Sequence, residues 1–379
     1  MKYLGHPQAE LESAGGIWTA REISQQPAVW PKIQSQLNAQ TAALQAFLRP
    51  LLDRKDLRII LTGAGTSAFI GECLAPTLKQ STRLRVDAIA TTDLVGSPDT
   101  WLDASVPTLF VSFARSGNSP ESLAAVNLAE QVVRERHHLI VTCNRSGELY
   151  SRAQQLKNAH VLLLPEETDD RGFAMTSSFS GMILAAALAF GALPQDEVQA
   201  IAQWAAGVLE TRVPLIAGLA QAGFERVVYL GGQEFKGLAR EAALKMLELS
   251  DGNMVALAET PLGFRHGPKT IVNSKTLIVM FLSNDAYARQ YEADLLRELR
   301  SDGVAGRVVA LGAAEESISV GAPATASNLA LCFPYAVFAQ TFAFLRSLSL
   351  GLRPDTPNAR GVVNRVVQGV SIYPWNPAR

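Results

Sequence analysis

The sequence predicts an α/β protein of two tandem flavodoxin-like domains, each a parallel sheet flanked by helices. The main observation is an internal repeat of three short apolar runs, which recur in the second half in the same order and at nearly the same spacing. Each run is rich in β-branched residues, ends at a turn and precedes a helix-like stretch, as buried parallel strands do. The paired runs are 58–63 with 226–231, 108–113 with 276–281, and 138–143 with 307–312.

The length of the chain supports the same division. At 379 residues, the chain is long for one core, and a prior of roughly 150 residues per domain predicts two domains. We expect a helical arm at 1–49, a first domain at 50–195, a second domain at 210–350 and a Pro-rich tail at 351–379.

Composition excludes several classes of function. Hydrophobic residues make up 48% and charged residues 18% of the chain, as in soluble globular proteins. The net charge is −1 and no basic tract is present, so we expect no nucleic-acid partner. The cysteines match no metal-ligand spacing and fit reduced thiols. Residues 1–30 contain no secretory signal, and the longest apolar run, 182–193, is shorter than the ~20 residues that span a bilayer. We therefore expect a cytoplasmic protein with no membrane partner and no metal.

The loop after the first run has glycines that fit a nucleotide site. Residues 63–68 read Gly-x-Gly-x-x-Ala, and Asp87 follows at the end of a further strand-like run, as a dinucleotide site requires. A dehydrogenase is therefore an alternative function. The counterpart at 231–234 lacks the pattern, which weighs against it, and the glycines also serve a tight strand-to-helix turn.

The loop after the second run predicts a phosphate site. Ser116 and Ser119 supply hydroxyls on either side of a glycine and Asn118, and Pro120 opens a helix whose free N–H groups attract an anion. Arg115 makes the loop mildly positive, which suits one phosphate monoester. The alternative, that one serine is an ordinary helix cap, explains one hydroxyl but not both.

The stretch 239–268 gathers the plausible acid–base groups. Glu241, Lys245 and Glu248 are spaced to project from one face of a helix. A solvated helix face has the same spacing, so that alternative stays open for Glu241 and Lys245. His266, in an Arg-His-Gly-Pro turn, can exchange a proton near neutral pH.

Four motifs together resemble the double sugar-isomerase-domain (SIS) family, which includes the isomerase half of glucosamine-6-phosphate synthase. They are 65–67, 116–119, 241–250 and 265–268. Segments 171–177, 264–268 and 363–369 resemble the family's bacterial ketose/aldose isomerases, which deaminate galactosamine 6-phosphate.

The resemblance implies roles for individual residues. Ser67, Ser116 and Ser119 would hold the sugar phosphate, with Arg115 and Asn118 beside them. Thr176 and Ser177 would lie near the sugar hydroxyls. Glu248 would move a proton between C1 and C2, and His266, lent by a neighbouring subunit of a homodimer or larger homo-oligomer, would open the sugar ring.

The tail departs from the family synthase. The synthase has a tail lysine that forms an imine with the ketose, and the matching position here is Gln368. We expect Gln368 to contact the sugar without imine chemistry. No glutamine-hydrolysing domain precedes the sugar domains, so we do not expect aminosugar synthesis from glutamine.

The implied reaction converts galactosamine 6-phosphate to tagatose 6-phosphate and ammonia through an enolamine and a ketimine, without a cofactor. The same base acting on a 2-hydroxy aldose would give plain aldose–ketose isomerisation. A non-catalytic sugar-phosphate sensor is a further alternative. The presence of Glu248 and His266, and an arm without a basic recognition helix, weigh against the sensor.

Overall fold

The structure is a computed structural model that describes residues 1–313, 317–367 and 369–376. It divides into two compact units, each assembled from separate stretches of the chain. Unit 1 holds residues 1–28, 170–176 and 196–361, and unit 2 holds residues 29–169, 177–195 and 362–379. The contiguous domain boundaries expected from the sequence remain a prediction.

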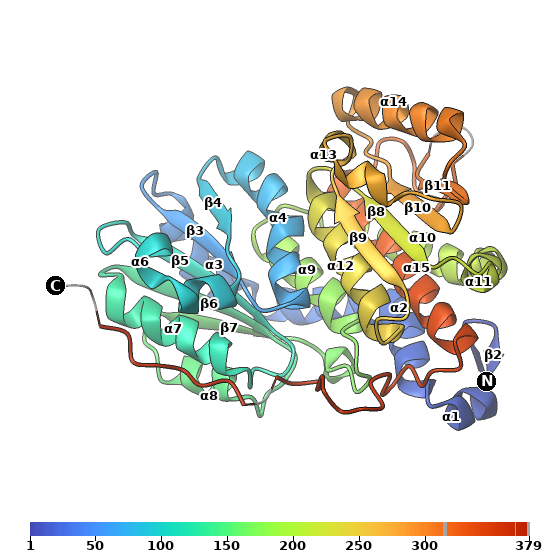
Figure 1. The fold of residues 1–379 in the computed structure, drawn as a ribbon. Coiled ribbons are helices and arrows are strands. Elements are labelled where there is room, and N and C mark those ends of the chain that lie inside the picture. The colour runs from blue at the N-terminus through green and yellow to red at the C-terminus, as the bar shows by residue number, and fades with distance from the viewer. Residues whose placement is uncertain (314–316, 368, 377–379) are drawn as a thin grey trace. The chain divides into compact units, whose positions relative to one another are not determined.

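Unit 2 is built on a five-stranded parallel sheet (Figure 1). The strand order is β4-β3-β5-β6-β7, which is the flavodoxin-like order 2-1-3-4-5. The strands are β3 (Arg58–Thr62), β4 (Arg85–Ala88), β5 (Thr108–Ala114), β6 (Arg136–Thr142) and β7 (Ala159–Leu163). The helical segments are α3 (Thr41–Leu52), α4 (Thr66–Thr82), α5 (Thr91–Gly96), α6 (Pro98–Trp101), α7 (Pro120–Val132), α8 (Glu148–Gln154), η1 (Glu166–Thr168) and α9 (Ser177–Ala189).

Unit 1 repeats this plan with four parallel strands in the order β11-β10-β8-β9. The strands are β8 (Arg226–Leu230), β9 (Val255–Glu259), β10 (Thr276–Phe281) and β11 (Arg307–Leu311). The helical segments are α1 (Gln8–Ala14), the first part of α2 (Ile17–Ala39), α10 (Glu197–Thr211), α11 (Val213–Gln221), α12 (Glu234–Leu249), α13 (Pro261–Phe264), η2 (Pro268–Ile271), α14 (Ala286–Asp302) and α15 (Asn328–Ser349). A short hairpin of β1 (Lys2–Tyr3) and β2 (His6–Pro7) precedes them.

All six predicted runs are strands, so the predicted fold class of two parallel sheets flanked by helices is confirmed. Five of the six runs form inner strands, β3, β5, β6, β8 and β10, because most side chains on both of their faces are buried under helices. The sixth run forms the edge strand β11. Each sheet has one topological switch point, between β3 and β5 in unit 2 and between β8 and β10 in unit 1. Ligands of open α/β sheets bind at such points, outside the carboxyl ends of the strands.

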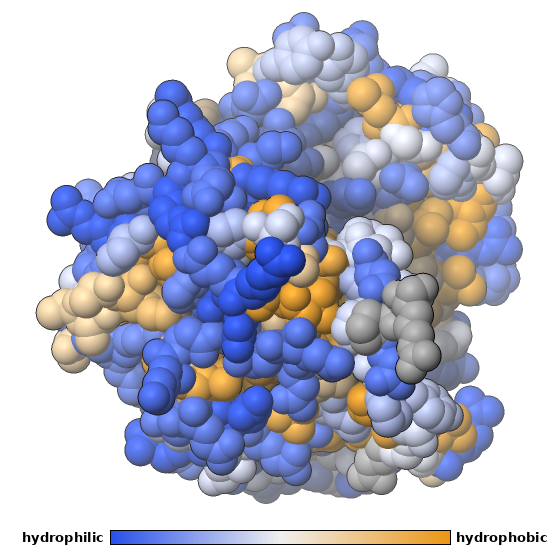
Figure 2. Space-filling model, turned by 90° about the vertical axis from the view of Figure 1, so that its left-hand side faces the viewer, coloured by the Kyte–Doolittle hydropathy of each residue, from blue (hydrophilic) through white to orange (hydrophobic). Residues whose placement is uncertain are grey.

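Helix α15 is the core helix of unit 1. It is 22 residues long and apolar enough to cross a membrane by composition, yet 94% of its most apolar window is buried inside the molecule. Helices α10, α11 and α12 pack against it. Burial by other helices explains its apolar composition without a bilayer. Figure 2 shows one face of the surface, which is mainly hydrophilic with hydrophobic residues in separate patches.

Candidate functional site

The first switch point carries the predicted phosphate loops. Strands β3 and β5 are parallel neighbours, with Thr62 opposite Ser112, so the loops that follow them leave the same edge of the sheet. The first loop leads into α4, whose first turn contains Ser67, a residue only 5% exposed. The second loop leads through Ser116 into α7. The structure therefore brings the two predicted loops to one edge.

The loop 116–119 turns sharply from β5 into α7. Gly117 has a φ of +66°, a conformation that favours glycine. Ser119 occupies the cap position of α7, but its hydroxyl lies 2.6 Å from the hydroxyl of Ser122 and does not cap a backbone N–H. The helix-cap interpretation of Ser119 is therefore wrong. The first turn of α7 begins with Pro120 and has no side-chain cap, so its positive end is available to an anion.

Two further residues of this loop make contacts with the protein. The amide oxygen of Asn118 accepts a hydrogen bond from the backbone N–H of Glu148 at 2.9 Å, which ties the loop to the start of α8. Asn144 Nδ2 donates to the carbonyl of Ser116 at 2.9 Å, a support that sequence reasoning missed. Arg115 is 6% exposed, and its Nη2 donates to the carbonyl of Arg365 at 2.9 Å. Arg115 and Asn118 thus each bind a backbone group of the protein.

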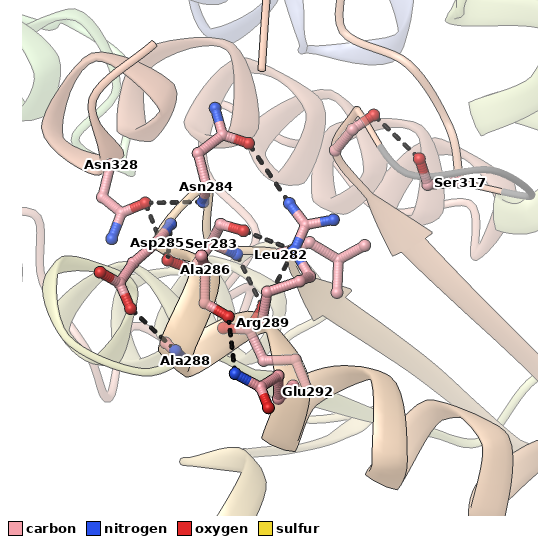
Figure 3. Close-up of polar contacts among 12 residues, drawn as sticks. Leu282, Ser283, Asn284, Asp285, Ala286, Ala288, Arg289, Glu292, Ser317 and Asn328 are labelled. Atoms are coloured by element: carbon pink, nitrogen blue, oxygen red, sulfur yellow. Dashed lines mark hydrogen bonds and ion pairs between the residues drawn. The ribbon is translucent and has the colours of Figure 1, made fainter. Parts of the chain in front are cut away.

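The second switch point is filled by Asn328, the first residue of α15. The amide oxygen of Asn328 accepts from the Ser283 hydroxyl at 3.0 Å and from the Asn284 N–H at 3.1 Å. Its amide nitrogen donates to Gln233 Oε1 at 2.7 Å and to Glu234 Oε2 at 3.2 Å. Asn328 therefore bridges the loops that follow β8 and β10. Figure 3 shows its amide directed at the backbone of Asn284.

The carboxylate of Glu292, on α14, binds the loop that follows β10. Its Oε2 accepts the N–H of Ser283 at 2.8 Å, and the side chain is 3% exposed. Burial raises the pKa of Glu292 to about 7, while the Ser283 hydrogen bond and the Arg289 charge oppose that rise. Asp285 caps α14 by accepting from the N–H group of Tyr287 and from that of Ala288, the second of which Figure 3 shows. This loop is thus occupied by the protein's own side chains.

The three predicted acid–base residues on α12 do share one face. Lys245 Nζ lies 3.5 Å from Glu241 Oε1 and is paired with Glu248 Oε2. The side chains of Glu241 and Lys245 are 2% and 1% exposed, whereas that of Glu248 is 23% exposed. A solvated helix face would expose all three, so that interpretation is wrong. The arrangement is a row in which a buried ammonium stands between two carboxylates and only one of them reaches solvent.

His266 lies in the turn between α13 and η2, in the same unit as α12. It is exposed, and its backbone N–H donates to Gly263 at 2.9 Å. Within the described part of the chain, its imidazole makes no hydrogen bond or ion pair. The neighbouring side chains Arg265 and Lys269 are both paired with Glu298. His266 is therefore presented outward while its neighbours are fixed.

The segment 170–176 is held by buried polar side chains of unit 1. Asp170 accepts from the N–H and the hydroxyl of Thr176 at 2.8 and 3.1 Å. Glu22, 150 residues away, accepts from the N–H groups of Arg171 at 2.5 Å and Gly172 at 3.2 Å. Burial and the nearby Asp170 charge raise the pKa of Glu22 to about 8. Thr176 is therefore fully enclosed, and its hydroxyl donates to Asp170.

Two more long-range contacts complete this segment. Gln340 on α15 donates to the carbonyl of Thr176 at 3.4 Å and accepts from Gln26 at 2.7 Å. Ser177 is 1% exposed and begins α9. Sequence reasoning missed Glu22, Gln26, Asp170 and Gln340 because no local pattern marks them. Gln368 lies outside the described residues.

Other candidate features lie elsewhere. Asp87, the ribose partner of the dehydrogenase interpretation, is engaged by Arg58 Nε at 2.6 Å and Arg85 Nε at 2.9 Å. A cavity of about 1000 Å³ beyond β6 and β7 contains Asn144 and Asp169 but none of the predicted site residues. Over residues 1–313, 317–367 and 369–376, no group of three or more His, Cys, Asp or Glu side chains could hold a metal ion.

Comparisons with known proteins show which proteins the chain resembles. A model of the SIS domain matches residues 51–192. The D-galactosamine-6-phosphate deaminase AgaS of Escherichia coli is 46% identical over 96% of this chain and 97% of its own length. The AgaS of Shewanella sp. strain ANA-3 is 44% identical over 97% of this chain and 94% of its own.

Solved structures extend the comparison. The tagatose-6-phosphate ketose/aldose isomerase of Escherichia coli is 42% identical, covers 98% of both chains and superposes with a TM-score of 0.89. The glucosamine-6-phosphate deaminase of Thermotoga maritima is 22% identical, with a TM-score of 0.72 over 92% of this chain and 99% of its own, and supports the fold alone.

Proposed function

The chain belongs to the AgaS family of SIS-domain proteins, and from that premise we propose that it deaminates D-galactosamine 6-phosphate to tagatose 6-phosphate and ammonia. The observation that carries the proposal is the row on α12. One carboxylate, that of Glu248, is accessible, and a buried ammonium and a second carboxylate stand behind it. A fixed, partly desolvated carboxylate is well suited to remove a proton next to a carbonyl.

The phosphate would bind at the first switch point. Serine hydroxyls at 67, 116 and 119 and the uncapped start of α7 offer neutral donors to a dianion. Hydrogen bonds to charged acceptors are stronger than those to neutral ones, so this edge would discriminate phosphorylated from free sugars.

In the proposed reaction, the open-chain aldehyde makes the C2 proton of the aminosugar acidic. Glu248 removes that proton to give an enolamine and returns it to C1, which leaves a ketimine at C2. Water adds to the ketimine, ammonia leaves, and the ketose 6-phosphate remains. Lys245, paired with Glu248, would hold the carboxylate in position.

His266 would open the ring of the sugar substrate bound in a neighbouring subunit. The exposed imidazole and its lack of a partner in the described chain support a role across a homodimer interface. Mixing inactive Glu248→Gln and His266→Ala subunits should then restore part of the activity. Subunit exchange without any recovery would contradict a shared site.

A direct assay tests the proposed reaction. Purified protein is incubated with galactosamine 6-phosphate, glucosamine 6-phosphate or galactose 6-phosphate, without NAD or metal, and ammonia and ketose 6-phosphate are measured together. Equal amounts of both products from the galacto substrate support the proposal. Ketose formed from galactose 6-phosphate, without ammonia from the aminosugar, would favour the isomerase. Tight binding without turnover would favour a sensor.

A further inference from the structure

The contact made by Arg115 points away from the role that its sequence position predicts. Arg115 follows the last residue of β5 and directly precedes Ser116 of the phosphate loop. It is 6% exposed, and its guanidinium donates to the carbonyl of Arg365, 250 residues later in the chain. A guanidinium that binds a backbone carbonyl fixes the path of that backbone, because its planar fork has a defined direction.

The tail segment 362–376 has further anchors in unit 2. The guanidinium of Arg365 lies 3.5 Å from the carboxylate of Asp169, beyond β7. Ten residues on, Trp375 packs against the buried cluster that includes Leu94 and Phe110, and its carbonyl accepts a hydrogen bond from Gln131 of α7 at 3.2 Å. In Figure 1, the C-terminal segment runs along α7. The tail is thus attached at both ends of the stretch 365–375.

We propose that Arg115 is a positioning residue that couples the phosphate loop to this tail, so that phosphate binding and tail docking stabilise each other. The proposal rests on the proposed function of the Ser116–Ser119 loop. Arg115 and Ser116 are adjacent in the chain, so a phosphate that fixes the loop also fixes the root of the Arg115 side chain.

Charge supports the same coupling. Docking the tail brings the cationic side chain of Arg365 to the unit that carries the loop, where Asp169 balances it. A phosphate dianion in the loop adds negative charge next to Arg115, which favours the Arg115 side chain staying at the loop. Coupling of this kind is reciprocal, since whatever phosphate adds to tail docking, the tail adds to phosphate affinity.

The first test follows the tail itself and needs no turnover. Trypsin cleavage after Arg360 and Arg365 is followed by mass spectrometry, with and without inorganic phosphate. Phosphate should slow cleavage of the unsubstituted protein by about five-fold or more, the lower end of typical coupling. The protection should disappear in Arg115→Gln. Protection that is absent in the unsubstituted protein, or that survives in Arg115→Gln, would overturn the proposal.

The second test separates tail positioning from direct phosphate contact. Trp375→Ala releases the far end of the tail without touching the loop, and Tyr373→Ala, an 81% exposed aromatic, is its matched control. Both Arg115→Gln and Trp375→Ala should raise the KM for the phosphorylated sugar, and the double variant should be no worse than the poorer single one. Tyr373→Ala should have no effect.

Additive effects of the two substitutions, or a normal KM in Trp375→Ala, would instead assign Arg115 to the phosphate. Because the cleavage test uses inorganic phosphate alone, it distinguishes a failure of the coupling from a failure of the proposed activity. An inactive protein whose tail is still protected by phosphate would remove the proposed reaction and keep the coupling. If Arg115→Gln does not fold, Trp375→Ala decides: with the far end released, phosphate should protect the tail less than in the unsubstituted protein, and undiminished protection would overturn the proposal.

Discussion

At the first switch point Gly65 leads into α4 with a φ of +56° and a ψ of −126°, and at the second Gln233 leads into α12 with almost the same values, +52° and −125°. The backbone turn of the repeat is therefore the same in both units. For a residue with a Cβ, this conformation costs on the order of 1–3 kcal/mol and persists only where the surroundings enforce it. The hydrogen bond from Asn328 to Gln233 is one such constraint.

The side chains placed on these matching turns differ. The first point carries small hydroxyl residues and an uncapped helix, whereas the second is crossed by Asn328 and closed by Glu292. Unit 1, which holds the second switch point, contributes instead the charged row Glu241, Lys245 and Glu248 on α12. We propose that the two repeats differ in role, with anion binding at the edge of the unit 2 sheet and acid–base chemistry on α12 of unit 1.

Removal of the base should give the largest effect. Glu248→Gln keeps the size of the side chain but cannot accept the C2 proton, so kcat should fall by about 10²- to 10⁴-fold with little change in binding. Stopped assays of ammonia release measure the rate, and calorimetry with the product ketose measures binding. A variant that turns over at the normal rate would place the base elsewhere.

Removal of the hydroxyls of Ser116 and Ser119 should act on binding. Ser116→Ala combined with Ser119→Ala removes donors to a charged phosphate, at about 1.5–3 kcal/mol per hydrogen bond, so KM should rise by at least ten-fold. The kcat at saturation should change much less. Ser105→Ala, an exposed serine of the same unit, is the control. An unchanged KM would remove the phosphate from this edge.

Removal of the Asn328 side chain, which bridges the loops after β8 and β10, should lower stability and leave phosphate binding intact. Asn328→Ala abolishes hydrogen bonds to both loops of the second point, so the free energy of unfolding should fall by about 1–3 kcal/mol. Urea denaturation compares it with Asn127→Ala, an exposed position on α7. A loss of phosphate affinity in Asn328→Ala without a loss of stability would show that the second point is a ligand site.

The pH dependence of the free energy of unfolding should reveal the raised pKa of Glu292. Its pKa of about 7 in the fold exceeds the ordinary value of 4.5, so the fold favours the protonated form. Its contribution to stability is complete below pH 4.5 and is lost as the pH rises through 7. Between pH 6 and pH 8 the loss should be about 1 kcal/mol. Glu292→Gln, which stays neutral, should lack this part of the slope. Parallel stability curves for the two proteins would contradict the raised pKa.

Much of the fold could be predicted because its central strands are continuous apolar runs. Runs of this kind are typical of a parallel sheet that is covered by helices on both faces. Strands β7 and β9 were missed because they lie at sheet edges and are only half-buried. The spacing of Glu241, Lys245 and Glu248 predicted a shared helix face correctly, but burial, which excludes a solvated face, depends on packing.

Contacts between distant stretches account for what the sequence could not show. Two sets of hydrogen bonds join residues more than a hundred positions apart. Arg115 donates to the carbonyl of Arg365, and Glu22 accepts from Arg171 and Gly172. In the sequence, Arg115 beside Ser116 and Ser119 predicts phosphate binding. That pattern is the same whether the guanidinium of Arg115 faces the ligand or the tail. Only the path of the tail distinguishes these outcomes.

The division of work between the two switch points is tested most directly by titrating inorganic phosphate into three proteins and following its ³¹P resonance. The unsubstituted chain and Asn328→Ala should each bind one phosphate per chain with similar affinity, and the Ser116→Ala, Ser119→Ala double variant should bind none in the same range. Binding that persists in the serine variant, or that is lost in Asn328→Ala, would contradict the assignment of the anion site to the first sheet.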